Sequence, residues 1–342
     1  MKKLKVGIVG LGEQMGDNIL PSVLLSSYAR ITAICDIDTD RLKSFQEKYS
    51  IRYTYRSYKQ MIDNIDLDVI IICSYPDVHF EVARYAILKN IAVFVEKPPT
   101  RTTKQLKELI YLAEKMEIKT GVGMNFSYTY SNEVSHKIMQ EENFGELSYI
   151  NIEHISSKPR EPFWNYDCVI ESFLLAQLIH PLDYLLRFFN KKYSKLEVFC
   201  SSSTKPFFIQ LMFTSHKGVI GSLLSGTYAQ RFQHKIEIIS NKGNSIKITD
   251  LNKVEISSPE ISSPFDINTK KCSLNLYKSP LKSGFNDSGY QNELDLFFKH
   301  ILFNEKFSHS FNDMLPVYTT MDTISQQITN RAINLQSKAA LV

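Results

Sequence analysis

The stretch KVGIVGLGEQMG, from Lys5 to Gly16, decides the fold that the sequence predicts. It opens with a short apolar run of the kind found in strands that are buried in a parallel sheet. Gly10 and Gly12 follow this run at once, and glycines permit a tight turn between a strand and the helix after it. The stretch therefore predicts the first strand and the first turn of a chain in which buried strands alternate with helices.

This alternation continues through the first third of the chain. Four more strand-like runs share the apolar character of the first, at 29–36, 68–73, 91–98 and 119–125. Segments of helical character lie between them, at 41–49, 80–89 and 103–116. Strand–helix alternation on this scale predicts a doubly wound parallel sheet, an α/β Rossmann domain, whose ligands bind at the carboxyl ends of the strands.

The glycine-rich turn predicts a phosphate-binding loop. Gly10 and Gly12 would let a pyrophosphate approach the backbone and the N-terminus of the following helix closely. The spacing departs from the G-x-G-x-x-G pattern, because Met15 occupies the third glycine position and Gly16 comes one residue late. Gln14 and Met15, inside this turn, are assigned to cofactor binding together with the first two glycines.

Asp36 strengthens the dinucleotide interpretation. It ends the second predicted strand about 20 residues beyond the glycine loop, where a carboxylate can accept hydrogen bonds from both hydroxyls of a ribose. The same negative charge would repel a 2′-phosphate, so Asp36 favours NAD as the cofactor, and NADP is kept as an alternative. The competing interpretation is an ordinary turn residue in CDIDTD, at 35–40.

The composition limits the partners. A chain of 342 residues is too long for one typical core and predicts two domains. The formal charge of +4, with scattered lysines and no basic block among aromatics, gives no support for nucleic-acid binding. The apolar run at the N-terminus is too short and too glycine-rich for a signal peptide, and no run approaches the length that spans a bilayer. We therefore expect no membrane partner.

The five cysteines stand far apart and form no C-x-x-C pair. This spacing indicates neither a disulfide framework nor a zinc site, so no metal ion is expected. Isolated cysteines fit a reducing compartment, and together with the lack of a signal peptide they predict a cytoplasmic protein.

A family resemblance is found at Glu96–Pro98, the EKP motif that follows the fourth predicted strand. With this motif the sequence resembles the glucose–fructose oxidoreductase/inositol dehydrogenase/MocA (Gfo/Idh/MocA) family over nearly its whole length. EKP at a strand end is quite specific, whereas the other motifs are individually weak but occur in the family's order. They are GIVGLGEQMG at 7–16, Asp36, CSYPDVHFEVA at 73–83, GVGMN at 121–125, WNYD at 164–167, HPLD at 180–183 and SGYQNELDLFF at 288–298.

The resemblance implies a dinucleotide-binding Rossmann domain over 1–124 and a second domain over 125–342. The second domain would be of the α+β class, with a large, open, mostly antiparallel sheet that holds substrate and joins subunits. The sequence agrees, because strict alternation stops near Asn125 and strand-like runs follow at 147–157, 195–203, 207–213, 218–228, 235–240 and 245–249. The Ser/Pro-rich segment at 257–263 is interpreted as a loop, and the C-terminal helices can pack back on the first domain. An open sheet would expose an apolar face in a monomer, so we expect a homodimer or homotetramer.

Lys97 is the predicted proton donor or acceptor. It comes one residue past a buried strand and before two prolines, and the resemblance implies a cis bond between Lys97 and Pro98. Burial near an oxidised, cationic nicotinamide would lower the pKa of the ammonium, so that Lys97 exchanges a proton near neutral pH. The competing interpretation is a surface lysine after a strand. By resemblance alone, Glu96, Lys97 and Asn125 are assigned to contacts with the nicotinamide end of the cofactor.

A second cofactor loop is implied by the resemblance at Ser74, Tyr75, Pro76 and His79, on the nicotinamide side of the dinucleotide. The family usually begins this loop with Thr-Pro, whereas this chain has Ser74 followed by Tyr75. Tyr75 in the proline position can change how the loop packs on the cofactor.

The apolar stretch FLLAQLIHPLDYLL, at 173–186, carries a histidine and an aspartate three residues apart. On a helix His180 and Asp183 share a face, so the carboxylate can orient the imidazole. The alternative is a core histidine with a local hydrogen-bond partner. The resemblance implies a substrate site here, but the family has an aspartate where this chain has Ala176. Gln177 can hydrogen-bond a substrate hydroxyl but cannot exchange a proton.

An aromatic segment completes the predicted substrate site. Trp164 and Asp167 resemble a family segment that borders the substrate, although Asn165 replaces the usual arginine. The rings of Phe163, Trp164 and Tyr166 can stack on a sugar. An aromatic loop that packs on the sheet is the alternative, with equal weight.

Together these residues predict an oxidoreductase that uses NAD, or alternatively NADP. Hydride would pass between the nicotinamide and a small, sugar- or polyol-like secondary alcohol or ketone, with Lys97 as proton donor or acceptor and His180 assisting. An imine or a specialised biosynthetic intermediate is the alternative substrate, because several pocket residues differ from the family pattern. A non-catalytic, nucleotide-binding regulator is the alternative from another class, which Ala176 favours and the two candidate catalytic residues oppose.

Overall fold

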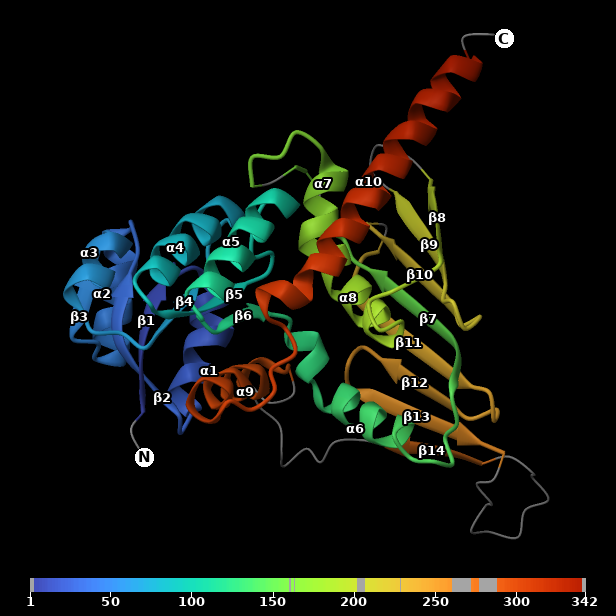
Figure 1. Ribbon diagram of the computed structural model, residues 1–342, viewed down its shortest axis with the longest axis horizontal. Helices are drawn as coiled ribbons and strands as arrows, with labels where there is room; N and C mark the ends of the chain where they lie inside the picture. Colours follow the sequence, from blue (N-terminus) through green and yellow to red (C-terminus); the bar gives the residue numbers. More distant parts are fainter. Residues whose placement is uncertain are drawn as a thin grey trace. The chain divides into compact units, whose positions relative to one another are not determined.

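The computed structural model describes residues 3–159, 161–162, 164–201, 207–227, 229–259, 272–276 and 288–339. Contacts within the chain divide it into two compact units. Unit 1 comprises Met1–Tyr128 and Gly284–Tyr318, and unit 2 comprises Thr129–Ser283 and Thr319–Val342. Each unit is therefore assembled from two separate pieces of the chain (Figure 1).

Unit 1 is built on a six-stranded parallel sheet with the order β3-β2-β1-β4-β5-β6. The strands are β1 (Leu4–Val9), β2 (Ala29–Cys35), β3 (Tyr53–Tyr55), β4 (Val69–Ile72), β5 (Ala92–Glu96) and β6 (Thr120–Gly123). All residues of β4 and β5 are buried, which explains why these strands read as unbroken apolar runs. The strand order runs outward from β1 to β3 on one side and from β4 to β6 on the other. A doubly wound sheet binds its ligand where these two directions meet, between β1 and β4. The predicted doubly wound sheet is confirmed.

Helices connect these strands and begin at recognisable capping residues. The carboxylate of Asp38 caps α2, and Thr102 with Gln105 forms a capping box at α5. The helical elements of unit 1 are a π-helical turn (Met15–Ile19), α1 (Leu20–Leu25), α2 (Thr39–Tyr49), α3 (Tyr58–Asn64), α4 (Pro76–Leu88), α5 (Thr103–Lys115), a 3-10 turn (Asn125–Tyr128) and α9 (Tyr290–Phe303). The short β3 and α3 were not predicted, because neither is long enough to show a clear period.

The late helix α9 supplies part of the core of unit 1. Its side chains Leu294, Phe297 and Phe298 are fully buried among the apolar strand residues. The Phe297 ring lies 5.3 Å from the Phe94 ring, and a Cβ on Gly121 would come within 2.8 Å of both rings. In Figure 1, α9 lies beside α1, with which it is in contact. The sheet of unit 1 is therefore completed by residues from near the end of the chain.

Unit 2 is built on an eight-stranded sheet with the order β14-β13-β12-β11-β7-β10-β9-β8. Its strands are β7 (Leu147–Ile155), β8 (Lys195–Cys200), β9 (Phe208–Thr214), β10 (Ile220–Gly226), β11 (Gln233–Ser240), β12 (Ser245–Thr249), β13 (Lys253–Ser258) and β14 (Cys272–Leu276). Only the β7–β10 pair is parallel among these strands, so the predicted, mostly antiparallel sheet is confirmed.

The interpretation of 257–263 as a loop was partly wrong. Ser257 and Ser258 pair with β12 or β14 as the last residues of β13, and residues 260–263 lie outside the described part of the chain. The alternation of buried Val254 and Ile256 with polar neighbours is the strand signal that the serines obscured.

The helices of unit 2 are α6 (Tyr130–Met139), α7 (Val169–Phe173), a π-helical turn (Leu174–Leu178), α8 (Ile179–Phe188) and α10 (Phe311–Ala339), which begins in unit 1. The expectation that no run is long enough to cross a bilayer was wrong, because Val169–Phe188 meets that criterion by length and composition. However, 83% of this stretch is buried in the structure, and α8 contacts β7 and β10. That burial is typical of a core helix.

The two faces of the second sheet differ. Along β9, Ile209, Leu211 and Phe213 are fully buried on one face. On the other face Met212 is 36% exposed, and Ile220 of the neighbouring β10 is 45% exposed. Apolar side chains therefore stand on the open face of the sheet, as the sequence predicted for an open second domain.

Candidate active site

The glycine loop after β1 has the geometry of a phosphate-binding turn. Gly10 has a φ of +87°, and a Cβ at this position would overlap the carbonyl oxygen of Cys73 after β4. The two strand ends can therefore meet only because residue 10 is glycine. By contrast, a Cβ on Gly12 would have no described atom within 4 Å. The loop thus packs tightly on one side and leaves open space on the other.

The late third glycine of this loop coincides with a π-helical turn at Met15–Ile19. A π-turn holds one residue more than an α-helical turn, which accommodates the one-residue shift from the usual glycine spacing. A Cβ on Gly16 would lie 3.0 Å from the ring of Phe45, so Gly16 permits the close packing expected of the third glycine. Met15 itself is fully buried in the core, so its side chain packs inward, and the assignment of residue 15 to cofactor binding stays a prediction that concerns its backbone.

The Gln14 side chain ties the loop to its surroundings. Its Nε2 donates to the hydroxyl of Tyr290 on α9 at 2.8 Å, and its Oε1 accepts from Asn18 at 3.1 Å. Burial, followed by the charge of Glu96, raises the pKa of Tyr290, so this phenol stays neutral. Both ends of the Gln14 amide thus hold the loop in place, and its contact with a cofactor stays a prediction.

Asp36 connects the first two strand ends. Its Oδ2 accepts from the Leu11 backbone N–H at 2.7 Å, and its Oδ1 accepts from the Asp38 N–H at 2.9 Å. Each carboxylate oxygen can accept a second hydrogen bond. The structure therefore fixes Asp36 at the carboxyl edge of the sheet, beside the glycine loop, with capacity left for ribose hydroxyls.

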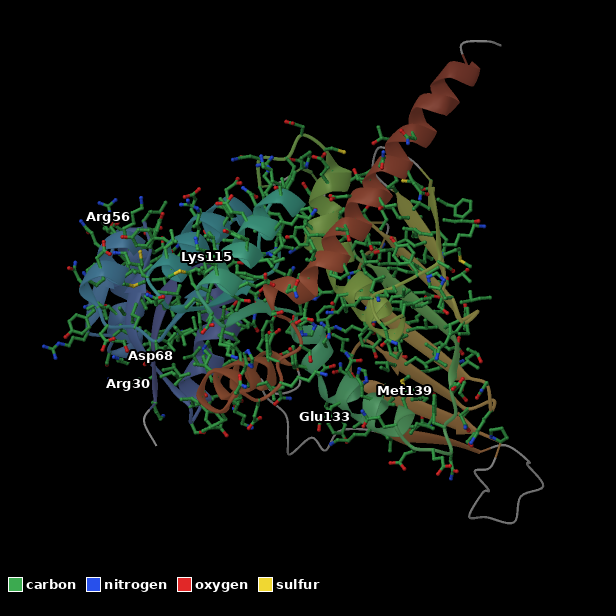
Figure 2. The ribbon with its side chains drawn as sticks, viewed as in Figure 1. Arg30, Arg56, Asp68, Lys115, Glu133 and Met139 are labelled. Carbon is green, nitrogen blue, oxygen red and sulfur yellow. The ribbon has the colours of Figure 1, made fainter. Side chains whose placement is uncertain are left out.

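Two residues next to Asp36 were not predicted from the sequence. Ile37 is 80% exposed, and its carbonyl accepts from Arg56 Nε at 3.3 Å. In Figure 2, Arg30 and Arg56 lie at opposite ends of the sheet. Arg30 is near the start of β2, and Arg56 directly follows the last residue of β3, so Arg56 lies at the end where the parallel strands finish. If Asp36 binds the ribose as predicted, an exposed isoleucine and a guanidinium beside it suit the flat face of an adenine ring. The apolar residue straight after the acid was the signal available in the sequence.

The His79 side chain links the loop at 74–79 to the loop that contains Pro98. The Ser74 backbone N–H donates to His79 Nε2 at 2.7 Å, which leaves the proton on Nδ1, and Nδ1 donates to the Pro98 carbonyl at 2.8 Å. Burial lowers the pKa of His79 to about 4, so the ring is neutral at neutral pH. His79 is only 1% exposed and joins two loops in the structure, and its contact with a cofactor stays a prediction.

The neighbouring residues of this loop differ in exposure. Tyr75 is 63% exposed at the N-cap position of α4, whereas Pro76 begins the helix and is buried. The Tyr75 side chain thus has room to meet a ligand.

Lys97 lies directly past β5, and its bond to Pro98 is cis, as the resemblance implied. Burial lowers the pKa of Lys97, and the charge of Glu96 opposes this shift. Conversely, burial raises the pKa of Glu96 to about 7, and the charge of Lys97 opposes that shift. The pKa values of the ammonium and of the carboxyl group have therefore moved toward each other.

A second buried acid was missed by sequence reasoning. Glu293, on α9, is fully buried, and one of its oxygens accepts from the Met124 backbone N–H, 169 residues away in the chain. Glu96 Oε1 would lie 2.7 Å from a Cβ on Gly123, so the two carboxyl groups flank consecutive residues at the end of β6. Burial, and next the charge of Glu96, raise the pKa of Glu293 well above its ordinary value, which favours its neutral form.

Asn125 is held by the second chain segment of unit 1. Its Nδ2 donates to the Ser288 carbonyl at 2.7 Å, and Gly289 has a φ of +85° where any Cβ would overlap the Asn125 carbonyl oxygen. The start of α9 thus fixes Asn125 at the end of β6, and its predicted contact with the nicotinamide amide stays a prediction.

The residues of unit 1 fit a bound dinucleotide. The space beside Gly12 can take phosphates, and Asp36 at the neighbouring strand end can take a ribose. At the end of β5, Glu96 Oε1 is buried without a hydrogen-bond partner among the described residues. A hydroxyl or amide donor of a ligand would satisfy this oxygen. Within the described ranges, no group of three or more His, Cys, Asp or Glu side chains is placed to hold a metal ion.

In unit 2, His180 and Asp183 are both buried on α8. Arg187 Nε donates to Asp183 Oδ2 at 2.8 Å, so the carboxylate predicted to orient the imidazole forms an ion pair one turn further along the helix. Ala176, where the resemblance implies a carboxylate, lies in the π-helical turn before α8 and is 5% exposed. The orientation of His180 by Asp183 stays a prediction.

Gln177, also in the π-helical turn, contacts the first of two paired histidines that sequence reasoning missed. Its Oε1 lies 3.3 Å from His154 Nε2, and His154 Nδ1 lies 3.1 Å from His234 Nδ1. The two histidines face each other across β7 and β11 and are 1% and 2% exposed. Their spacing of 80 residues in the chain left no local signal.

The aromatic segment before α7 is described from Trp164 onward, and Phe163 lies outside the described residues. Trp164 and Asn165 have φ values of +58° and +57°, a conformation in which L-residues are uncommon. Asp167 is exposed, and Trp164 is half-buried. A strained turn is frequent where a ligand is held, so the role of this segment in substrate binding stays a prediction.

Known proteins share both the sequence pattern and the fold. The sequence profile of the Gfo/Idh/MocA oxidoreductase family, with an NAD-binding Rossmann fold, matches residues 4–124. The crystal structure of a dehydrogenase from Chromobacterium violaceum has 30% sequence identity, a TM-score of 0.94 and coverage of 99% of each chain.

Two sugar or polyol dehydrogenases are among the similar proteins. Inositol 2-dehydrogenase of Salmonella typhimurium is 27% identical over 199 residues, which is 57% of this chain and 57% of that enzyme. Levoglucosan dehydrogenase, solved in complex with NADH and L-sorbose, has a TM-score of 0.82 at 18% identity and coverage of 96% and 98%. At that identity the second likeness concerns the fold alone.

The fold and the cofactor unit define an oxidoreductase that binds NAD through a Rossmann domain. Within that class, the chain belongs to the Gfo/Idh/MocA family.

Proposed function

We propose that this protein interconverts a secondary alcohol and a ketone on a sugar- or polyol-like substrate with NAD. The observation that carries the proposal is Lys97, a half-buried lysine at the ligand edge of the cofactor unit with a lowered pKa. The substrate class is supported by similarity to inositol 2-dehydrogenase and levoglucosan dehydrogenase, and the chain spans little more than half of the former.

The proton chemistry follows from the state of Lys97. Bound NAD would supply the hydride acceptor, or NADH the donor. A neutral Lys97 Nζ takes the proton of the substrate hydroxyl during oxidation, and the ammonium returns it to the carbonyl oxygen during reduction. Burial lowers the pKa of Lys97 and the charge of Glu96 opposes this shift, so Lys97 gives up its proton more easily than a lysine in water.

His180 is proposed as the second residue on the substrate oxygen. It is a nearly buried imidazole on α8, and an imidazole can donate or accept a hydrogen bond at the pH where such enzymes work. Gln177 is proposed to contact a hydroxyl, and Trp164 with Asp167 to border the sugar ring.

Asp36 supports NAD rather than NADP as the cofactor in use. Its carboxylate is fixed by two backbone N–H donors and is 8% exposed, so it cannot swing away from a 2′-phosphate. Like charges at hydrogen-bond distance are strongly unfavourable, so NADPH should bind at least about tenfold more weakly than NADH.

The decisive experiment measures cofactor binding and turnover separately. NADH and NADPH are titrated by nicotinamide fluorescence, and myo-inositol, levoglucosan, L-sorbose and D-glucose are screened with wild type and Lys97→Ala. We expect turnover of a sugar or polyol, a loss of about 100-fold or more in kcat for Lys97→Ala, and little change in NADH affinity.

Lys115→Ala, on the exposed surface of α5, is the matched control and should behave like wild type. Tight NADH binding with no turnover of any member of the panel would instead support a nucleotide-binding regulator. That outcome is favoured by one observation, the Ala176 side chain where the family has an acid. Full activity of Lys97→Ala would disprove the proton path.

A further inference from the structure

Unit 2 contains a chain of three polar side chains, formed by two buried histidines of its sheet and the half-buried Gln177. His154 on β7 and His234 on β11 are directly opposite each other in the antiparallel register. Their ring centroids are 5.3 Å apart at 77°, and Phe232 packs edge-on against His154 at 5.4 Å. Gln177 reaches this pair from the π-helical turn. Two facing, buried histidines are costly unless each nitrogen that points inward is matched to a partner.

The contacts determine where the protons lie. Gln177 Oε1 can only accept a hydrogen bond, so His154 Nε2, 3.3 Å away, carries a proton. A neutral His154 then has a bare Nδ1, which accepts from the Nδ1–H of His234 at 3.1 Å. Burial, and next the neighbouring His154, lower the pKa of His234 well below its ordinary value, in agreement with a neutral His234. Protons therefore point in one direction, from His234 to His154 to Gln177.

The backbones of both histidines are fixed independently of their rings. The Ser225 hydroxyl of β10 donates to the His154 carbonyl at 2.7 Å. The His234 N–H donates to Asp250 Oδ1 at 3.0 Å, and the Asp250 N–H donates to the His234 carbonyl at 2.7 Å. Because neither strand can shift easily, the two rings form a rigid support for whatever they contact.

Gln177, the side chain that His154 contacts, lies three residues before His180 and next to Ala176. With its oxygen engaged by His154, the Gln177 amide has its two N–H donors at the opposite end. A π-helical turn changes the direction of side chains relative to an α-helix and is frequent at functional sites. Gln177 is half-buried, unlike its apolar neighbours in this turn, so its amide is not wholly enclosed.

We propose that His234 and His154 are positioning residues that lock the Gln177 amide with its N–H donors toward the substrate. The locked amide selects a substrate oxygen that accepts a hydrogen bond, such as a carbonyl, ring or hydroxyl oxygen, and it lies one residue after the position at which the resemblance implies a carboxylate. This proposal rests on the proposed function, because it concerns the substrate of that same site.

His234, His154 and Gln177 form a relay of two hydrogen bonds, and two conservative variants of His154 separate the contribution of each bond. In His154→Asn the amide occupies the position of Nδ1, so the contact with His234 is kept and the one with Gln177 is lost. In His154→Gln the amide reaches the position of Nε2, so the contact with Gln177 is kept. With the member of the sugar panel that is turned over best, we expect KM to rise about tenfold in His154→Asn, with kcat and NADH affinity nearly unchanged. His154→Gln should recover most of the wild-type KM.

A double-mutant cycle distinguishes positioning from a general structural role. If His154 acts only through Gln177, the double variant His154→Asn/Gln177→Ala should have the KM of Gln177→Ala alone. Losses that simply add, or an equal defect in His154→Asn and His154→Gln, would overturn the proposal.

The proton positions are tested without any substrate. Long-range nitrogen–proton spectra of protein labelled with ¹⁵N-histidine should show His154 protonated on Nε2 and His234 protonated on Nδ1. Replacing Gln177 by Leu should weaken this preference at His154 only. The reverse tautomers would overturn the relay even in an active enzyme. The expected tautomers in a protein that turns over no sugar would support the relay and place the failure in the proposed function.

Discussion

At the scale of single residues, Gly10 and Gly12 differ in what surrounds them although they are two positions apart. Gly10→Ala should destabilise unit 1 by more than about 2 kcal/mol, because its φ of +87° is strained for alanine and its Cβ would overlap Cys73. Gly12→Ala should change stability by less than about 0.5 kcal/mol, since its Cβ meets no described atom. It should instead weaken NADH binding at least about tenfold by filling the space for phosphates.

Urea unfolding followed by circular dichroism measures the first effect, and NADH fluorescence measures the second. The two glycines serve as controls for each other. Equal losses of stability in both variants would contradict this account of the loop.

The buried acid Glu96 predicts a pH dependence of stability. Its pKa rises from 4.5 to about 7 on folding, because burial disfavours the charged form. The stabilisation from its protonated form is complete below about pH 4.5 and is lost as the pH rises through about 7. Wild type should therefore lose about 1–3 kcal/mol between pH 5 and pH 8 relative to Glu96→Gln, which cannot ionise.

Urea midpoints of both proteins at pH 5 and pH 8 give this difference. Glu114→Gln, an exposed position on α5, should follow the pH profile of wild type. Parallel profiles for wild type and Glu96→Gln would show that Glu96 ionises normally in the folded state.

Which site residues the sequence predicts depends on whether their role is local. Gly10, Asp36 and Lys97 could be assigned because a strand end, a turn and an acid or lysine lie within a few positions of one another. Glu293 and His154 could not, because their partners are 169 and 80 residues away in the chain. Nor could the enclosure of His79 be predicted, since it depends on the Pro98 carbonyl of another loop.

At the scale of elements, α9 is tested by comparing two phenylalanines on its opposite faces. Phe297 is fully buried against Phe94, whereas Phe303 is 46% exposed. Phe297→Ala should destabilise unit 1 by about 3–5 kcal/mol, and Phe303→Ala by less than about 1 kcal/mol. The single tryptophan, Trp164, lies in unit 2, so its fluorescence follows that unit while circular dichroism follows both.

The expected result is an early dichroism transition in Phe297→Ala that precedes the fluorescence transition. Coincident transitions shifted by the same amount in both variants would show that α9 does not support unit 1 in particular.

Long apolar or amphipathic elements could be predicted because their period is visible in the sequence. The two π-helical turns could not, because an extra residue in a helix changes no propensity that can be read locally. The first turn explains why the glycine spacing looked irregular, and the second lies in the stretch that carries Ala176 and Gln177. Both departures from the family pattern therefore coincide with a local change of helix geometry.

At the scale of the whole molecule, the open face of the second sheet predicts association. Met212 and Ile220 stand exposed on this face of β9 and β10. We propose that it joins copies of the chain into a homodimer or homotetramer. Met212→Lys/Ile220→Lys should then give a monomer, because burying two ammonium groups in an interface is unfavourable.

Light scattering coupled to size exclusion gives the molar mass of both proteins. Leu24→Lys/Leu25→Lys, on exposed positions of α1, is a control that should leave the mass unchanged. A wild-type mass of one chain, 39.4 kDa, would contradict the proposal.

The return of the chain to unit 1 at Gly284–Tyr318 has a consequence during synthesis on the ribosome. Domains at the start of a chain usually fold while the rest is still being made. Here the strands of the first domain leave the ribosome early, but Phe94 and Gly121 meet Phe297 only after most of the second domain has been translated. The part of unit 1 that is synthesised first, Met1–Tyr128, therefore completes its core late. The nascent chain must keep the uncovered sheet soluble until α9 emerges.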